Sequence, residues 1–181
     1  DSAREFIEQL NPDIEVTTRE TRVTQDNVES LIEGYDVVVD ASDNFPTRFL
    51  LNDACMLAGI PLSHGAVYQF EGQATTITGR PCYRCLFPEA PPEGAVPDCA
   101  TAGVLGVLPG TIGAIQATEV VKLLMGLGET LHGRLLAYDA RDMTTEFVPI
   151  APNPECPVCG EEPAIDSVTE GEYAGACTLG D

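Results

Sequence analysis

Residues 35–59 read YDVVVDASDNFPTRFLLNDACMLAG, and this stretch decides the fold. The valine run ending at Asp40 is typical of a strand buried on both faces, as in a parallel sheet. A turn-prone DASDN follows, and the pattern from about Thr47 to Gly59 predicts a helix. Upstream, apolar residues 14–16 predict a strand and residues 24–33 a polar helix. Together these segments form a predicted strand–helix–strand unit.

The chain downstream of residue 59 predicts the rest of an α/β sheet. IPLSHGAV, residues 60–67, has the composition of a short strand, and residues 69–78 alternate polar with apolar side chains as antiparallel strands do. A long helix is predicted over 103–126, followed by strands at 135–139 and 145–150. We therefore expect a Rossmann-like, doubly wound sheet with an antiparallel extension.

Composition limits the classes of function. The chain has 181 residues, 44% of them hydrophobic, which suits one sizeable domain. Its 29 acidic and 9 basic residues give a net charge of −20, which argues against non-specific binding to nucleic acid or to an anionic membrane. We interpret the scattered acids as the solvated surface of a cytoplasmic protein from a salt-loving cell, although an ordinary acidic protein has the same composition.

The stretch from 100 to 118 carries no charge, so we considered it as a membrane span. It contains several glycines, a proline and Gln116, and Glu119 and Lys122 follow at once. A buried helix of a water-soluble domain is the better interpretation. The opening residues 1–10 read as an amphipathic helix and not as a signal peptide.

Four of the seven cysteines form two C-x-x-C pairs, Cys82 with Cys85 and Cys156 with Cys159. Two such pairs supply four thiolates, the set that structural tetrahedral zinc sites use. The predicted zinc would join the end of the domain to its middle. Two redox dithiols or two disulfides are the alternatives.

The other three cysteines differ in context. Cys55 lies among apolar residues of a predicted helix, where a thiol usually fills space. Nothing near Cys177 indicates a role. Cys99 follows the proline-rich PEAPPEGAVPD and precedes the long helix, whose N-terminus favours a thiolate, while Asp98 opposes it. An incidental loop cysteine is the alternative for Cys99.

A second group of polar residues follows the valine strand. Asp43 and Asn44 lie at its carboxyl end, where doubly wound sheets bind ligands, and Arg48 is four residues further on. A carboxylate there can hold a magnesium ion that bridges phosphates, or Asp43 or Asn44 can simply cap the next helix. His64 and His132 have no partner motif, and we expect structural roles for both.

Taken in order, the motifs VVVDASDNFPTRFLLND, EGQATT, CYRC, DCATAGVLGVLPGTIGAIQATEVVKLL, LLAYDA and NPECPVCG resemble the ThiF/MoeB/HesA family from residue 1 to about 160. The family comprises prokaryotic relatives of ubiquitin-activating enzymes. Its members use ATP and magnesium to adenylate the C-terminal glycine of a small β-grasp protein ending in Gly-Gly, and some pass the acyl group to a cysteine. The resemblance implies sulfur transfer for molybdopterin, thiamine or tRNA thiolation, or protein modification, with a sulfurtransferase partner and a homodimer.

By position, the resemblance assigns Asp43 to magnesium and ATP, places Asn44 beside it and makes Arg48 a weaker candidate for the same site. It makes Cys99 the acyl acceptor, forming a thioester, or an acyl persulfide if sulfur is supplied. Residues 1–160 would be the C-terminal part of the adenylyltransferase domain, and 161–181 a flexible acidic tail.

The family's glycine-rich strand–turn, its ribose-binding acid and its phosphate-binding arginine and lysine do not occur in this sequence. The sequence therefore predicts about half an ATP site, with N-terminal strands supplied by a longer chain or another subunit. One alternative is a non-catalytic, zinc-stabilised scaffold that binds the β-grasp protein for another ATP-binding chain. An NAD-dependent Rossmann oxidoreductase is disfavoured because no dinucleotide fingerprint is present.

Overall fold

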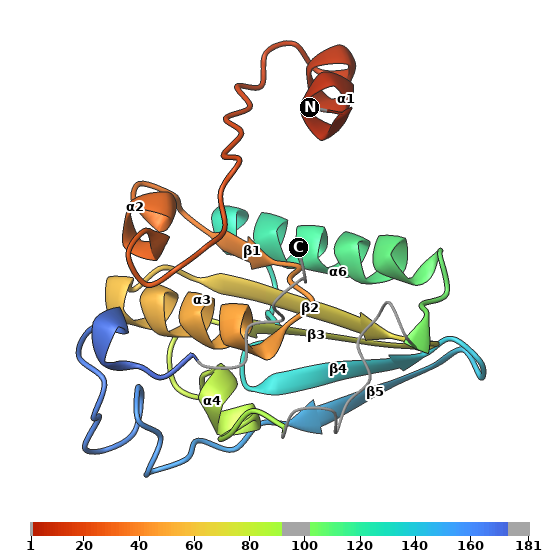
Figure 1. Ribbon diagram of the computed structural model, residues 1–181. Coiled ribbons are helices and arrows are strands. Elements are labelled where there is room, and N and C mark those ends of the chain that lie inside the picture. The colour runs from red at the N-terminus through yellow and green to blue at the C-terminus, as the bar shows by residue number, and fades with distance from the viewer. Residues whose placement is uncertain (1, 92–101, 174–181) are drawn as a thin grey trace.

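A mixed sheet with helices on both faces forms the body of the protein (Figure 1). The computed structural model describes residues 2–91 and 102–173. Within them the sheet has five strands in the order β1-β2-β3-β4-β5. The elements are α1 (Ser2–Leu10), α2 (Val28–Ile32), β1 (Val38–Asp40), α3 (Phe45–Ala58), β2 (Leu62–Tyr68), β3 (Glu71–Ile77), α4 (Tyr83–Leu86), α6 (Leu108–Met125), β4 (Arg134–Asp139), β5 (Thr144–Pro149) and the 3-10 helix η1 (Val168–Glu170).

The first two strands are parallel and α3 is the crossover between them, as the sequence predicted. Asn44 caps α3, because its side chain accepts a hydrogen bond from the Thr47 amide at 2.9 Å. Gly59 ends the helix with φ of 68°, the left-handed conformation that glycine adopts without strain. In the register between the strands, Asp40 lies opposite His64.

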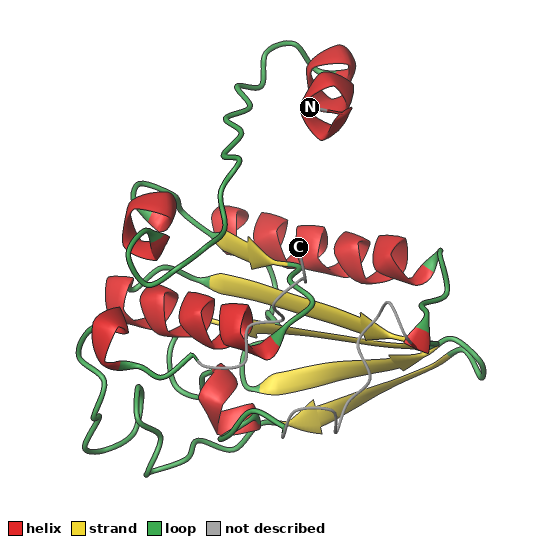
Figure 2. Cartoon of the chain, viewed as in Figure 1, coloured by secondary structure: helices red, strands yellow, loops and turns green. Residues whose placement is uncertain are grey.

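Strands β2 to β5 form the predicted antiparallel extension. Helix α6 packs on one face of β2 and β3, while α3 and α4 lie on the other side (Figures 1 and 2). Gly65 and Gly72 let α6 approach closely: a Cβ on Gly65 would overlap the Gln116 side chain, and one on Gly72 would lie 2.5 Å from Ile112. The doubly wound α/β prediction is thus confirmed for the described residues.

Several predicted boundaries were wrong. Residues 14–16 form no strand, and Ile14 is half exposed. Strand β1 pairs only with β2 in the described residues, so nothing there gives 14–16 a strand partner. The 24–33 helix shortens to α2. Helix α6 starts at Leu108 instead of 103, because Gly103 has φ of 74° and Val104 bridges to Gln69.

Helix α1 forms where the sequence predicted it, but it lies apart from the sheet (Figure 1). None of its residues is buried, and the Phe6 and Leu10 side chains are 67% and 76% exposed. Its apolar face therefore has no packing partner in the described part of the chain.

Residues 161–173 pack on the domain, although the sequence predicted a flexible tail from 161. Ile165 and Val168 are buried in the core beside α3. The Gln25 side-chain amide donates hydrogen bonds to the carbonyls of Val168 and Gly171. The predicted division at residue 160 stays a prediction, and residues 174–181 lie outside the described residues.

Helix α6, which contains most of the uncharged stretch, lies along the sheet with Gln116 and Glu119 buried. Over residues 2–91 and 102–173, no helix combines the length and apolar character that crossing a membrane requires.

Candidate functional site

The loop that follows β1 presents the Asp43 carboxylate at the surface, just before α3 begins. The side-chain amide of Asn44 donates to Asp43 Oδ1 at 3.3 Å, and Asn44 Oδ1 caps the helix. The sequence left Asp43 and Asn44 as alternative caps of this helix, and the structure shows that Asn44 is the cap. Asp43 makes no cap bond, so its carboxylate is available to a ligand at the carboxyl end of the strand.

Arg48, the weaker candidate for the ATP site, turns back to the loop. Its Nη2 and Nε donate to the Ser42 carbonyl at 2.9 and 3.3 Å, and its guanidinium lies 5.3 Å from the centre of the Phe45 ring. The residue is 9% exposed. Arg48 and Asp43 are thus brought to one loop, but at least two of the five guanidinium N–H groups are engaged there.

A buried pair, His64 and Asp40, which the sequence analysis did not identify, is hydrogen-bonded to this loop. His64 Nδ1 lies 2.8 Å from Asp40 Oδ2, and the two side chains are 0% and 1% exposed. Asp40 Oδ1 also accepts the Ser42 amide at 2.8 Å. Burial raises the pKa of Asp40, but its hydrogen bonds to His64 and Ser42 lower that pKa by more than burial raises it. The pKa of Asp40 therefore lies below its usual 3.8.

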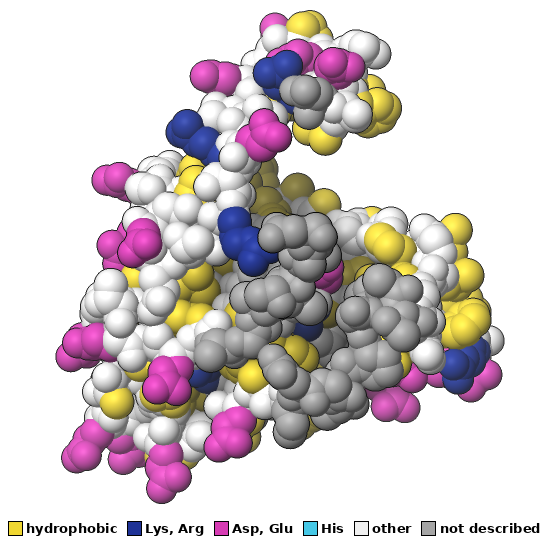
Figure 3. All heavy atoms as spheres, in the orientation of Figure 1, with side chains coloured by type: hydrophobic (Ala, Val, Ile, Leu, Met, Phe, Trp, Pro, Cys, Tyr) yellow, Lys and Arg dark blue, Asp and Glu magenta, His cyan; other side chains and the backbone are white. Residues whose placement is uncertain are grey.

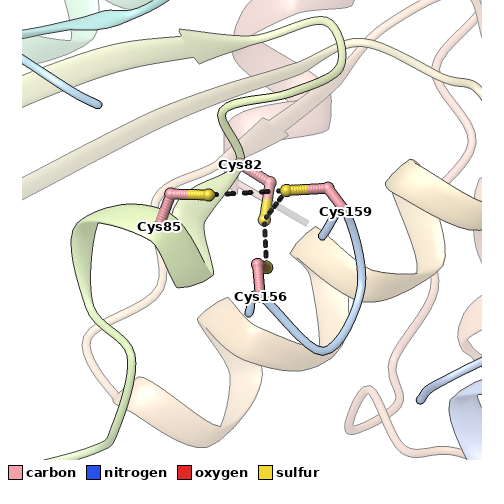
Figure 4. Close-up of side chains that lie close together, drawn as sticks. All are labelled: Cys82, Cys85, Cys156 and Cys159. Carbon is pink, nitrogen blue, oxygen red and sulfur yellow. Dashed lines mark hydrogen bonds between the residues drawn. The ribbon is translucent and has the colours of Figure 1, made fainter. Parts of the chain in front are cut away.

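Four cysteines come together from two segments far apart in the chain (Figure 4). Cys82 is the residue before α4 and Cys85 lies within that helix, while Cys156 and Cys159 lie on the loop after β5. All four Sγ atoms lie within 4.8 Å of one another. Cys82 Sγ is 3.6 Å from that of Cys156 and 3.4 Å from that of Cys159, and Cys85 Sγ is 3.4 Å from that of Cys159.

The donor set and its spacing fit a zinc ion. Zn–S bonds of about 2.3 Å in a tetrahedron place neighbouring sulfur atoms roughly 3.8 Å apart, close to the observed separations. The backbone amide of Asn153 also points to Cys85 Sγ at 3.4 Å, as amides do toward metal-bound thiolates. A hydrogen bond from Cys82 and the amides of Cys159 and Val158 lower the pKa of Cys156 to about 5, against the effect of burial.

Gly160 shapes the second cysteine turn. A Cβ at this position would overlap the carbonyl oxygen of Cys156 and lie 2.5 Å from that of Pro154, and the Gly160 amide donates to the Cys156 carbonyl. The residue after Cys159 must therefore be glycine for the turn to close. The signal for this requirement in the sequence is the glycine that directly follows the second cysteine in CPVCG.

An ion pair anchors the first cysteine turn to α3. Arg84, between Cys82 and Cys85, donates through Nε and Nη2 to the Asp53 carboxylate at 2.8 and 2.6 Å. Asp53 also accepts the Tyr173 hydroxyl at 2.8 Å, and Asn52 Oδ1 accepts the Tyr83 amide at 2.8 Å. No sequence signal links these residues, because they come from separate elements.

The structure leaves some predicted residues apart or undescribed. The Asp43 loop and the cysteine cluster are separate sites, joined through α3 and Tyr83. Cys99 and Cys177 lie outside the described residues. His132 accepts the Thr78 amide at 3.4 Å and Cys55 is buried, in line with the structural roles predicted for both. Acidic side chains are spread over the visible face, with few basic ones among them (Figure 3).

This arrangement of strand, capped helix and cysteine pairs can be compared with known proteins. The model of the ThiF family matches residues 1–158. The chain belongs to the ThiF family. Among its relatives are the SAMP-activating enzyme E1 of Haloferax volcanii, 62% identical over 180 residues, and the sulfur carrier protein adenylyltransferase of Thermus thermophilus, 50% identical over 184. The adenylyltransferase and sulfurtransferase MOCS3 of Aedes aegypti is 43% identical over 182 residues.

Each alignment includes nearly all of this ThiF-family chain, but only part of the relative. The matched share is 66% of the Haloferax protein, 67% of the Thermus protein and 41% of the Aedes protein. The chain therefore spans about two thirds of the length of the first two relatives and less than half of the third.

Solved structures show the same fold at low sequence identity. The complex of Escherichia coli MccB with ATP superposes with a TM-score of 0.71 at 15% identity, over 86% of this chain and 49% of the MccB chain. A second MccB structure, with the MccA-N7isoASN ligand, has a TM-score of 0.72 over 87% of this chain and 50% of MccB, at 15% identity. At this level of identity the likeness concerns the fold alone.

Proposed function

We propose that this chain is part of an enzyme that uses ATP to adenylate the C-terminal glycine of a ubiquitin-like β-grasp protein ending in Gly-Gly. The observation that carries the proposal is the exposed Asp43 carboxylate at the carboxyl end of β1, in a chain of the ThiF family. The named activities of the relatives, SAMP activation and sulfur carrier adenylylation, support the same reaction class.

In the proposed reaction, a carboxylate oxygen of the terminal glycine attacks the α-phosphorus of ATP. The bond from that phosphorus to the bridging oxygen breaks, and pyrophosphate leaves. Asp43 would hold magnesium, which neutralises charge on the phosphate oxygens. The chain's own contribution is to keep the Asp43 side chain at the end of β1, with Asn44 as its hydrogen-bonding neighbour.

Arg48, the basic residue at this loop, already donates to the Ser42 carbonyl. Further phosphate-binding groups are therefore needed to neutralise the charge of ATP. We propose that a longer chain or a second subunit supplies them beside β1. The outer edge of β1 pairs with no strand in the described residues, and Val39 there is 50% exposed. A shallow apolar groove of about 350 Å³ lies along this edge, between Val23 and Leu51.

Cys99 is proposed as the acceptor in a second step. Its thiolate would attack the carbonyl carbon of the acyl-adenylate, forming a thioester and releasing AMP. If a sulfurtransferase partner first transferred the outer sulfur of its own persulfide to the Cys99 thiolate, leaving as a thiolate itself, the resulting Cys99 persulfide would attack the same carbonyl carbon, displace AMP and give an acyl persulfide. Cys82, Cys85, Cys156 and Cys159 are proposed to hold a structural zinc ion that joins the end of the domain to its middle.

The test is ATP–pyrophosphate exchange by the full-length gene product, with and without a β-grasp protein ending in Gly-Gly. Concentrated potassium chloride is included to screen the net charge of −20. We expect exchange to require the β-grasp protein and to fall by at least about a hundredfold in Asp43→Ala, as losses of single electrostatic groups do.

Asp142→Ala is the matched control, because Asp142 is an exposed aspartate on the turn between β4 and β5. Its exchange rate should equal that of the wild type. Failure of a folded, zinc-loaded wild type to exchange pyrophosphate, while it still binds the β-grasp protein, would favour the scaffold over the enzyme.

A further inference from the structure

We propose that the buried His64–Asp40 pair positions Asp43, by holding the backbone of Ser42 from beneath the loop. This inference rests on the proposed adenylation function for its effect on activity. In this proposal His64, Asp40 and Ser42 are positioning residues for Asp43, a role that no sequence motif indicated.

Both backbone polar groups of Ser42 are hydrogen-bonded to side chains. Its amide donates to Asp40 Oδ1 at 2.8 Å, and its carbonyl accepts from Arg48 Nη2 at 2.9 Å. The next residue is Asp43, whose side chain accepts a hydrogen bond from the side-chain amide of Asn44 and makes no other in the described residues. The direction of the Asp43 carboxylate therefore depends on the conformation of the backbone, which is fixed by the two hydrogen bonds of Ser42.

Asp40 is in turn held on several sides. His64 Nδ1 lies 2.8 Å from Oδ2, while Gln116 Nε2 donates to the Asp40 carbonyl at 2.8 Å. Gln116 also donates to the Ser63 carbonyl at 3.1 Å, so it connects the last residue of β1 and the start of β2 to α6. Because Asp40 faces His64 in the parallel register, a rigid sheet supports both side chains.

The His64 ring is fixed by aromatic packing. Its centroid is 4.7 Å from that of Tyr83, which is itself 1% exposed. His64 Nε2 is buried and has no hydrogen-bond partner in the described residues. An apolar side chain would fill this space without burying an unpaired nitrogen, which costs free energy. The benefit of histidine at this position is its Nδ1 contact with Asp40.

Residues that orient a metal ligand affect metal affinity by about ten- to a hundredfold when they are replaced. His64→Leu removes the Nδ1 donor at similar volume, so we expect the magnesium concentration for half-maximal ATP–pyrophosphate exchange to rise by about this factor. The KM for the β-grasp protein should stay unchanged. His64→Asn places an amide N–H where Nδ1 was and should recover most of the loss. His132→Gln is the control.

A second readout does not depend on activity. Hydrogen–deuterium exchange followed residue by residue with NMR should show the Ser42 amide less protected in His64→Leu than in the wild type or His64→Asn. Equal magnesium dependence in His64→Leu and wild type, or equal losses in the Leu and Asn variants, would overturn the proposal. If the wild type has no exchange activity, the proposed function fails, and the amide protection alone decides whether the pair holds the loop.

Discussion

The buried ion pair between Asp53 and Arg84 gives a quantitative test of how the first cysteine turn is held. Asp53 is fully buried and accepts hydrogen bonds from Arg84, Tyr173 and Asn52. Asp53→Asn keeps the size of the side chain and one acceptor oxygen, but it turns an amide toward the Arg84 guanidinium. Arg84, which is 8% exposed, would then be a buried charge without its counter-ion.

Removing one partner of a buried ion pair costs about 3–5 kcal/mol of folding free energy. With a urea m-value of about 2 kcal/mol/M, this lowers the unfolding midpoint by roughly 1.5–2.5 M. The assay is equilibrium urea unfolding of the zinc-loaded protein at constant potassium chloride, followed by circular dichroism. Tyr173→Phe removes one hydrogen bond and should cost only about 1 kcal/mol.

Asp142→Asn is the surface control and should leave the midpoint unchanged, because Asp142 is exposed. A midpoint for Asp53→Asn within 0.5 M of wild type would refute the claim that this pair anchors the turn. The double variant Asp53→Leu/Arg84→Met offers a further check. It should lose less stability than Asp53→Asn, because it leaves no unpaired charge.

Two other predictions concern Glu119 and Gly160. Burial raises the pKa of Glu119, but its hydrogen bonds, of which the one from Lys122 has the largest effect, lower that pKa by more. The pKa of Glu119 therefore lies below its usual 4.5. Its contribution to stability is therefore present above pH 4.5 and lost as the pH falls through the lower folded value, so urea midpoints between pH 6 and 3 should fall less steeply in Glu119→Gln. Gly160→Ala should cost about 1–3 kcal/mol, since its Cβ overlaps the Cys156 carbonyl, and should speed zinc release to a chelator. Gly113→Ala, with open space around its Cβ, should instead stabilise α6 by about 0.5–1 kcal/mol, and an equal loss in both variants would contradict the steric reason.

Local patterns in the sequence were enough to predict much of the fold. The valine run predicted the parallel strand β1, although Val39 is 50% exposed there and the strand is not buried on both faces; Asn44 and Gly59 bound the helix between β1 and β2. The cysteine spacing predicted a cluster that the structure brings together. Each of these signals is carried by residues close in sequence or by a spacing with one common chemical use.

The features that the sequence did not reveal depend on contacts between distant segments. Asp40 meets His64 only because β1 and β2 pair in one particular register, and Asp53 meets Arg84 only because α4 packs on α3. The apolar residues 14–16 predicted a strand, but a strand forms only where another strand pairs with it, and no strand of the described residues does so here. Ile165 in an acidic segment looked like a tail residue, but it packs into the core.

The distance in sequence between the two cysteine turns has a consequence for the order of folding. Cys82 and Cys156 are 74 positions apart, and β5 ends at Pro149, before the second turn begins. At synthesis rates of about 5–20 residues per second, the second pair of thiols leaves the ribosome about 4–15 s after the first. All five strands of the described sheet are therefore synthesised before the four-cysteine cluster can assemble. Its assembly becomes a late event in biogenesis, and a chain that stops short of Cys156 has only the first cysteine pair with which to bind the proposed zinc ion.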